Sequence, residues 1–239
     1  MYTFRSRVRY SEVDSNGTMD LTSVINYFQD CSTFHSEDVN QGLSHLQKVN
    51  RIWLLNSWQI IIHRFASLGE NITIGTWPYA FNGFYGYRNF IMKDANDEVL
   101  AVANSVWIYM DSLSYRPVRI LPENLSGYET EPPYEMDYTA RKIDVPLELI
   151  DFSPFPVVKS NIDSNNHVNN GQYIKMAEEY LPENFIITQM RAEYKMSAVL
   201  GDMITPKTCF SNNCCTVILS NTSNKPYAIM EFEGKNASN

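Results

Sequence analysis

The first apolar stripe with helical spacing runs over residues 21–34, where Leu, Val, Ile, Phe and Cys recur three or four positions apart. Asp20 or Thr22 would cap the N-terminus of this helix, and Gly42 is a stop signal for the helix on its C-terminal side. The spacing predicts an amphipathic helix with one broad apolar face.

A second stripe with the same spacing covers residues 173–181. Asn169 or Asn170 can cap this helix, and Pro182 follows its expected end. We therefore expect one helix in each half of the chain.

Runs rich in β-branched and aromatic residues follow each helix and predict antiparallel strands. The segment 94–97 (Asp-Ala-Asn-Asp) is typical of a hairpin turn between two of them. Leu-Gly-Glu at 68–70 and Leu-Gly-Asp at 200–202 mark the same turn in each half, 132 residues apart. The expected strands are 52–64, 71–81, 84–93 and 99–110 in the first half, and 186–196, 202–210, 214–219 and 227–233 in the second.

A polar motif ahead of each helix indicates that the two halves repeat each other. The first half has Ser-Glu-Val-Asp-Ser-Asn-Gly at residues 11–17, and the second has Ser-Asn-Ile-Asp-Ser-Asn-Asn at 160–166, an offset of 149 residues. One strand, a long helix and four or more antiparallel strands therefore occur twice.

This order of elements predicts an α+β fold: two tandem hot-dog domains, each a long helix wrapped by an antiparallel sheet, forming an internal pseudo-dimer. Seven of the eleven prolines lie between Pro117 and Pro156. Within this region, residues 121–146 are acidic and show little periodicity, and we interpret them as a linker. The expected boundaries are 1–120 for the N-terminal domain, 121–146 for the linker and 147–239 for the C-terminal domain.

Composition and charge narrow the class of protein. The chain has 239 residues, a net charge of −8, and 44% hydrophobic and 13% aromatic residues, which is too apolar for a disordered chain. The acidic balance argues against nucleic acid, which needs clustered Lys and Arg. No run approaches the roughly 18 apolar residues of a membrane span, and the first ten residues lack the apolar core of a leader. We expect no nucleic acid, no membrane span and a cytoplasmic location.

The cysteines and histidines show no metal-ligand spacing, so we expect neither a metal nor another cofactor. A catalytic thiolate would need a nearby His or a helix N-terminus, and the sequence shows no such partner. We expect the cysteines to be small buried hydrophobes in a reducing compartment. The residues concerned are Cys31, Cys209, Cys214, Cys215, His35, His45, His63 and His167.

Polar side chains are concentrated in the loop that leads into the second helix, residues 163–173 (Asp-Ser-Asn-Asn-His-Val-Asn-Asn-Gly-Gln-Tyr). Asp and Asn are ordinary turn and cap residues, but this loop has more of them than one cap needs. The first half has Thr18 in place of His167, and Asp-Leu in place of the Asn-Asn pair two residues later. Because only one of the two repeated loops carries the histidine and the Asn-Asn pair, we expect a single active site in the chain.

The pattern D-x-N-x-H-V-N-N-x-x-Y resembles the active-site segment of acyl-acyl carrier protein (acyl-ACP) thioesterases, which are double hot-dog enzymes of bacteria and plant plastids. Single hot-dog acyl-CoA thioesterases share its short form. The similarity extends over about residues 4–235, and the start of the chain fits a bacterial-type member. Supporting segments are Trp53-Leu54-Leu55, Gly69-Glu70, Thr76-Trp77-Pro78, Tyr87-Arg88, Ala103-Asn104-Ser105-Val106-Trp107 with Asp111, and Arg116-Pro117.

The resemblance implies hydrolysis of an acyl thioester on the phosphopantetheine arm of acyl carrier protein, with release of a fatty acid. It assigns Asp163 to orienting or activating the nucleophile, and it gives Asn165, His167 and the start of the second helix positioning and oxyanion roles. Whether an anhydride forms or water attacks directly stays open. It also implies that the first half holds the acyl chain, with Tyr27 and Trp58 as candidate substrate-binding residues in a tunnel.

The chain departs from the plant members after the second helix, where they carry Glu and then Cys. Ser197 and Ala198 stand at those positions. Three explanations stay open: the loop carboxylate works with the loop histidine alone, Glu178 or Glu193 substitutes, or turnover is weak. We expect Glu193 to be an exposed strand residue.

The leading hypothesis is an acyl-ACP thioesterase, and the alternatives are an acyl-CoA thioesterase and a weakly active or non-catalytic acyl-binding hot-dog protein. Carrier proteins are acidic, so a net charge of −8 would repel one, and docking would need a local basic patch. A homodimer of the chain is left open. The docking candidates, chosen by sign alone, are Arg64, Arg88, Arg116, Arg119 and Lys159.

Overall fold

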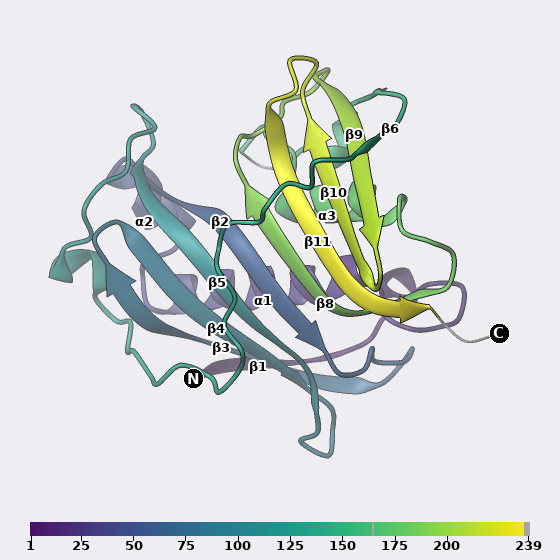
Figure 1. The fold of residues 1–239 in the computed structure, drawn as a ribbon. Coiled ribbons are helices and arrows are strands. Elements are labelled where there is room, and N and C mark those ends of the chain that lie inside the picture. Colours follow the sequence, from purple (N-terminus) through teal and green to yellow (C-terminus); the bar gives the residue numbers. More distant parts are fainter. Residues whose placement is uncertain (164, 237–239) are drawn as a thin grey trace. The chain divides into compact units, whose positions relative to one another are not determined.

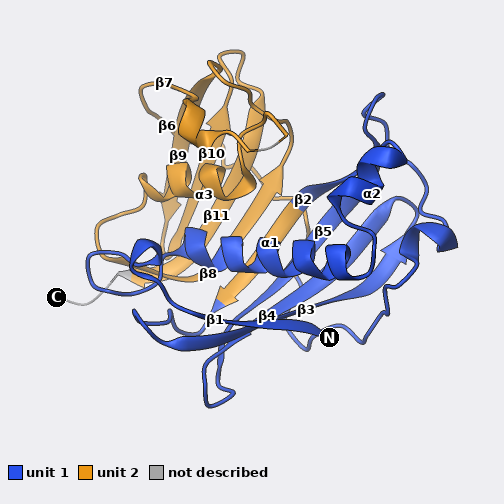
Figure 2. Ribbon diagram, turned by 180° about the vertical axis from the view of Figure 1, so that it is seen from behind, with its two compact units in different colours: residues 1–56, 62–138 blue, residues 57–61, 139–239 orange. Residues whose placement is uncertain are grey.

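The computed structural model describes residues 1–163 and 165–236, which form two units. Unit 1 comprises residues 1–56 and 62–138, and unit 2 comprises 57–61 and the chain from 139 onward (Figure 2). Ser164, which belongs to the repeated polar motif, lies outside the described residues. In each unit a helix packs on an antiparallel sheet, as the repeated pattern predicts.

In unit 1 the sheet order is β1-β3-β4-β5, followed by β2 (Figure 1). The helix α1 packs on β1 and β3 of this sheet. A short helix, α2, forms in the polar stretch after α1, where the sequence pattern predicted none. The elements of unit 1 are β1 (Tyr2–Arg7), η1 (Tyr10–Glu12), α1 (Leu21–Asp38), α2 (Leu43–Lys48), β2 (Arg51–Ile62, of which 57–61 belong to unit 2), β3 (Asn71–Asn82), β4 (Tyr85–Lys93), β5 (Val99–Asp111) and η2 (Pro122–Leu125).

The helix α1 forms because its apolar side chains share one face and its first turn is capped. The Asp20 carboxylate accepts the N–H of Ser23 at 2.6 Å, which confirms the predicted cap. Phe28 and Cys31 are fully buried, and the Phe28 ring lies 5.2 Å from that of Phe90 on β4. Burying one such aromatic side chain stabilises the fold by roughly 1.5–3 kcal/mol. The core of unit 1 therefore lies between α1 and its sheet.

Unit 2 repeats this plan with the helix α3 packed on β10 and β11. Its antiparallel sheet has the order β8-β11-β10-β9-β6, with β7 also on β9 and residues 57–61 of β2 on β8. Even the register repeats, because Arg7 pairs with Asn71 in unit 1 and Pro156 with Met203 in unit 2. The elements are β6 (Ile150–Asp151), β7 (Phe155–Pro156), η3 (Lys159–Asn161), α3 (Asn170–Glu178), β8 (Phe185–Tyr194), β9 (Met203–Ser211), β10 (Cys214–Ser220) and β11 (Pro226–Asn236).

All eight expected strands are confirmed, with ends within three residues of the predicted ones. The helix α3 is shorter than predicted, since it ends at Glu178 rather than Leu181. The N–H groups of Tyr180 and Leu181 donate three residues back, which tightens the chain into a turn. Pro182 explains the early end, because a proline disfavours helical geometry in the residue before it.

The proline-rich stretch is packed rather than free. In unit 1 the side-chain oxygen of Asn89, which is fully buried, accepts hydrogen bonds from the Tyr134 N–H and the Tyr138 hydroxyl, both at 3.0 Å. In unit 2 Ile143 is 2% exposed and packs against Ile218 and Ile229. The stretch thus fills part of both cores.

Candidate active site

In the polar loop ahead of α3, the described residues 163 and 165–167 are joined by the hydrogen bonds of a turn. The Asp163 N–H donates to the His167 carbonyl at 2.8 Å, and the Asn166 N–H donates to the Asp163 carbonyl at 3.1 Å. One carboxylate oxygen of Asp163, Oδ1, accepts the N–H of Asn165 at 2.8 Å and that of His167 at 3.5 Å. Asn166 has φ of +61°, a left-handed conformation that asparagine tolerates well. The Asp163 side chain therefore holds the loop backbone in shape.

Two buried tyrosines fix this loop to the sheet of unit 2. The Val168 N–H donates to the Ala198 carbonyl at 2.9 Å, and the Ala198 N–H donates in turn to the Tyr173 hydroxyl at 2.8 Å. The Tyr194 hydroxyl donates to the Asn170 carbonyl at 3.0 Å, at the first residue of α3. Burial raises the pKa of both tyrosines, so their hydroxyls stay protonated and act as structural anchors.

Asn165 and His167 contribute backbone N–H groups to the turn, and their side chains take no part in its hydrogen bonds. Within residues 1–163 and 165–236, no hydrogen bond joins either side chain to another residue. The helix α3 begins three residues after His167, and the Asn169 side chain caps it by accepting the Gly171 N–H at 2.8 Å. The N-terminus of a helix carries partial positive charge and orphan N–H groups, which suit an oxyanion. The loop thus carries an imidazole, an amide and a helix N-terminus within residues 165–170.

The structure does not bring Glu193 to this loop, and the prediction that it is exposed is wrong. Glu193 is 5% exposed because the chain before β6 covers it: one carboxylate oxygen accepts the Ile143 N–H at 3.1 Å and the other contacts Lys195. Neighbouring strand residues point to opposite faces, and the next residue, Tyr194, reaches α3. Glu193 therefore faces away from α3.

Glu178, the other residue that could replace the glutamate of the plant members, lies at the far end of α3 from the loop. Glu178 is the last residue of α3, about 12 Å along the helix axis from its first residue at 1.5 Å per residue. Ser197 is exposed and adjoins Ala198, the residue whose carbonyl accepts the Val168 N–H. Ser197, which stands where plant members carry Glu, is therefore next in sequence to a residue that contacts the loop.

Tyr27 and Trp58 are both buried, at 5% and 2% exposure. The Tyr27 hydroxyl lies 3.0 Å from the Ser6 hydroxyl and donates to the Glu12 carboxylate at 2.8 Å, so its polar end is occupied within unit 1. Trp58 belongs to the part of β2 that pairs with β8 in unit 2. The loop residues 163, 165 and 167 are together, whereas these two aromatic residues lie in other elements.

One of the basic docking candidates is not on the surface. Arg88 is 8% exposed, and its guanidinium donates to Nδ1 of His35 at 3.0 Å inside unit 1. Arg64 is exposed, but its guanidinium forms ion pairs with Glu70 and Asp94. Arg116, Arg119 and Lys159 are also exposed, and they form no ion pair within the described part of the chain.

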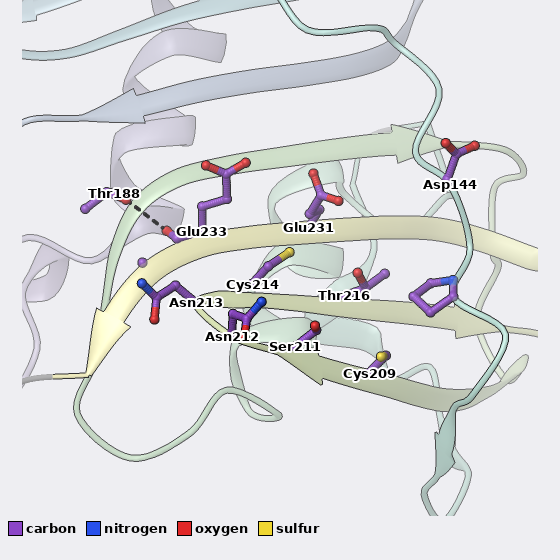
Figure 3. A pocket seen from close by; sticks show the side chains of 12 residues that line it. Asp144, Thr188, Cys209, Ser211, Asn212, Asn213, Cys214, Thr216, Glu231 and Glu233 are labelled. Atoms are coloured by element: carbon purple, nitrogen blue, oxygen red, sulfur yellow. Dashed lines mark hydrogen bonds between the residues drawn. The ribbon is translucent and has the colours of Figure 1, made fainter.

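A separate hollow of about 610 Å³ lies on unit 2, lined mainly by polar side chains from β8 to β11 and by the chain at Asp144 (Figure 3). It contains none of the loop residues. Cys214 lies in it, and burial raises the pKa of this thiol to about 11. Burial likewise raises the pKa of Cys31 to about 12 and that of Cys215 to about 11. All four cysteines are free, and these three are protonated thiols rather than nucleophiles.

Two further features of the described residues bear on chemistry and location. Outside residues 164 and 237–239, no group of three or more His, Cys, Asp or Glu side chains is arranged to hold a metal ion. In the same part of the chain, no helix has the length and apolar character needed to cross a bilayer.

Comparison with known families matches both units. The acyl-ACP thioesterase N-terminal domain matches residues 1–128, and the acyl-ACP thioesterase C-terminal domain matches residues 146–226. A palmitoyl-acyl carrier protein thioesterase of Gossypium hirsutum is 26% identical over 226 residues, which are 86% of this chain and 54% of that protein. Oleoyl-acyl carrier protein thioesterase 1 of Arabidopsis thaliana is 25% identical over 201 residues, 76% of this chain and 55% of that protein. The chain spans about half the length of these curated relatives.

Solved structures match almost the whole fold. An acyl-ACP thioesterase from Bacteroides thetaiotaomicron gives a TM-score of 0.89 at 20% identity, covering 98% of this chain and 97% of the other. A 12:0-ACP thioesterase from Umbellularia californica gives 0.84 at 17% identity, covering 99% and 98%.

Two copies of a helix on an antiparallel sheet, matched over nearly their full length by these structures, define a double hot-dog protein of the α+β class, as predicted. Because the two domain matches together cover most of the chain, it belongs to the acyl-ACP thioesterase family. The resemblance noted in the sequence is thereby confirmed.

Proposed function

We propose that this chain is a thioester hydrolase that cleaves the acyl thioester of an acyl carrier protein and releases a free fatty acid. Family membership supports this, as do the acyl-carrier-protein substrates named for its relatives. One observation carries the proposal: the turn at 163–167 presents the His167 side chain, without a partner among the described residues, immediately ahead of α3. Thr18 stands at the matched position of unit 1.

The chemistry needs no reagent other than water. A water oxygen adds to the thioester carbonyl carbon, the carbon–sulfur bond then breaks, and the products are a carboxylic acid and a thiol. His167 can accept the water proton and return it to the departing sulfur. The N-terminus of α3 can stabilise the oxyanion of the tetrahedral intermediate, and the Asn165 amide can orient water or the carbonyl.

The decisive variant is His167→Ala, with Thr18→Ala as the matched control in unit 1. We expect kcat for fatty acid release from acyl-ACP to fall about 100-fold or more in His167→Ala, because general bases typically contribute 10²–10⁴ in rate. Thr18→Ala should retain wild-type turnover. Equal rates in both variants would reject His167 as the base.

The same assay separates the alternative functions. Fatty acid release is measured by mass spectrometry on acyl-ACP and acyl-CoA of matched chain length. A strong preference for CoA would favour the acyl-CoA thioesterase. No release from either substrate, together with fatty acid retained by the purified protein, would favour the acyl-binding alternative, for which Ser197 in place of Glu is the supporting observation.

Substrate-binding roles for Tyr27 and Trp58 belong to the same proposal, with support from their burial. Replacing Trp58 by Phe removes ring volume and should shift the released acids toward longer chains if the indole lines the acyl tunnel. An unchanged distribution of chain lengths would remove Trp58 from the site.

We further propose a cytoplasmic location for this chain, although the named plant relatives are chloroplastic. The four free cysteines support a reducing compartment. A homodimer stays a prediction, which light scattering of the purified chain would test.

A further inference from the structure

Four turns in the described part of the chain share one backbone geometry, and the candidate active-site loop is one of them. They span residues 14–18, 94–98, 163–167 and 221–225. In each, the N–H of the first residue donates to the carbonyl of the fifth at 2.8–3.0 Å, and the N–H of the fourth donates to the carbonyl of the first at 3.0–3.3 Å. The fourth residue always has a positive φ, between +60° and +73°.

The first side chain plays the same part in all four turns. Its Oδ1 accepts the N–H groups of the third and fifth residues: at 2.8 and 3.0 Å for Asp14, 2.8 and 2.9 Å for Asp94, and 2.8 and 3.5 Å for Asp163. For Asn221 both distances are 2.9 Å. An amide oxygen therefore closes this turn as well as a carboxylate oxygen does, because the turn uses a single acceptor atom.

Three of these turns have no place in the proposed chemistry. The turn at 94–98 joins β4 to β5, the one at 221–225 joins β10 to β11, and the one at 14–18 precedes α1 in the unit without the histidine. An Asp or Asn at the first position is thus what this turn requires wherever it occurs. The presence of a carboxylate at residue 163 needs no catalytic explanation.

The four turns differ at the fifth position, where His167 corresponds to Thr18, Glu98 and Lys225. Resting on the proposed function, we propose that Asp163 is a positioning residue rather than a catalytic base or nucleophile. Its Oδ1 closes the turn and thereby sets the backbone that carries His167 at the mouth of α3. The proton acceptor of the hydrolysis is then the imidazole, and no anhydride forms on Asp163.

The test compares Asp163→Asn with Asp163→Ala in the full chain. Asparagine keeps the single acceptor atom but can act neither as a base nor as a carboxylate nucleophile, whereas alanine removes the acceptor. We expect Asp163→Asn to keep kcat within about threefold of wild type with an unchanged pH profile, and Asp163→Ala to lose at least about tenfold. If Asp163→Asn loses the 10²–10⁴ expected for a missing general base, the proposal is overturned.

Hydrogen exchange of the loop amides gives a second readout that does not depend on turnover. The N–H groups of Asn165 and His167 should keep their protection in Asp163→Asn and lose it in Asp163→Ala. Asp14→Asn and Asp14→Ala are the matched pair: they should change the protection of the corresponding amides of unit 1 in the same way, with turnover unchanged. Protection lost equally in both Asp163 variants would show that the charge itself shapes the turn and would also overturn the proposal.

These outcomes separate this inference from the proposed function. A wild-type chain that hydrolyses neither acyl-ACP nor acyl-CoA removes the function, and with it any role of Asp163 in catalysis. An active wild type with an inactive Asp163→Asn leaves the thioesterase standing and removes only the positioning role.

Discussion

The imidazole of His35 should make the stability of unit 1 depend on pH. His35 is 9% exposed, and its Nδ1 accepts a hydrogen bond from the guanidinium of Arg88 at 3.0 Å. The ring of Tyr2 stacks on it at 5.0 Å, and that of Tyr128 meets its edge at 5.3 Å. Protonation would place a second positive charge beside a buried arginine and would remove the acceptor.

Burial, and then the charges of Arg88 and the N-terminus, lower the pKa of His35 from 6.5 to about 4, with Asp38 and Glu131 opposing this. The folded state therefore binds fewer protons than the unfolded state between these two values. The contribution of the neutral His35 ring to the free energy of unfolding is fully present well above pH 6.5 and is lost as the pH drops toward 4. Between pH 7.5 and 5 this linkage amounts to a loss of about 2 kcal/mol in the free energy of unfolding.

The perturbation is His35→Gln, whose side-chain oxygen can still accept from Arg88 but does not titrate in this range. Urea denaturation of both proteins at pH 7.5, 6 and 5 gives the free energy of unfolding at each pH. The wild type should lose about 2 kcal/mol more than the variant between pH 7.5 and 5. His63→Gln, at an exposed position, is the control.

Parallel pH dependence in wild type and His35→Gln would refute the reasoning, since every other titrating group is common to both proteins. An NMR titration of the His35 ring provides an independent check. A midpoint near 6.5 would show that the ring is not held neutral by its surroundings.

Two further substitutions test what stabilises unit 2. Tyr173→Phe removes the hydroxyl that accepts the Ala198 N–H and should lower the free energy of unfolding by about 1–3 kcal/mol, because a buried N–H is left unpaired. The control is Tyr10→Phe, at a position 85% exposed, which should leave the denaturation midpoint unchanged. Equal midpoints for the two variants would contradict the anchor role of Tyr173. Gly201→Ala should cost about 1–2 kcal/mol, because Gly201 has φ of +88° with no atom close to a new Cβ, so the penalty is purely conformational. Gly201→Asn should cost less, and a melting temperature that ranks Asn below Ala would contradict this.

Much of the fold was predictable from local pattern, because the duplicated motif, the helix caps and the strand runs are all encoded by neighbouring residues. Asp20 is a cap by its own side chain, and Asp-x-Asn at 14–16, 94–96 and 163–165 is a sequence signal for the recurring turn. The apolar stripe predicted too long a helix at α3. Tyr180 and Leu181 continue the apolar spacing, but the chain tightens into a turn there, before Pro182.

The errors concern residues whose surroundings come from distant parts of the chain. Glu193 is covered by a segment some fifty positions earlier in the chain, where Ile143 donates its N–H to the carboxylate. Arg88 is enclosed by α1 and by the chain around Tyr128, so its charge is absent from the surface. Neither covering segment can be placed from the spacing of residues in β4 or β8. The roles of the loop side chains were likewise hidden, since comparing the four turns requires their hydrogen bonds.

A turn that folds by its own local hydrogen bonds separates the placing of a side chain from the identity of that side chain. After duplication of an ancestral unit, the fifth position of either copy could change without disturbing the backbone around it. Unit 1 still has the turn and the capped helix behind it, with Thr18 where unit 2 has its imidazole. The two copies could therefore diverge in chemistry one residue at a time, with the fold unaffected at every step.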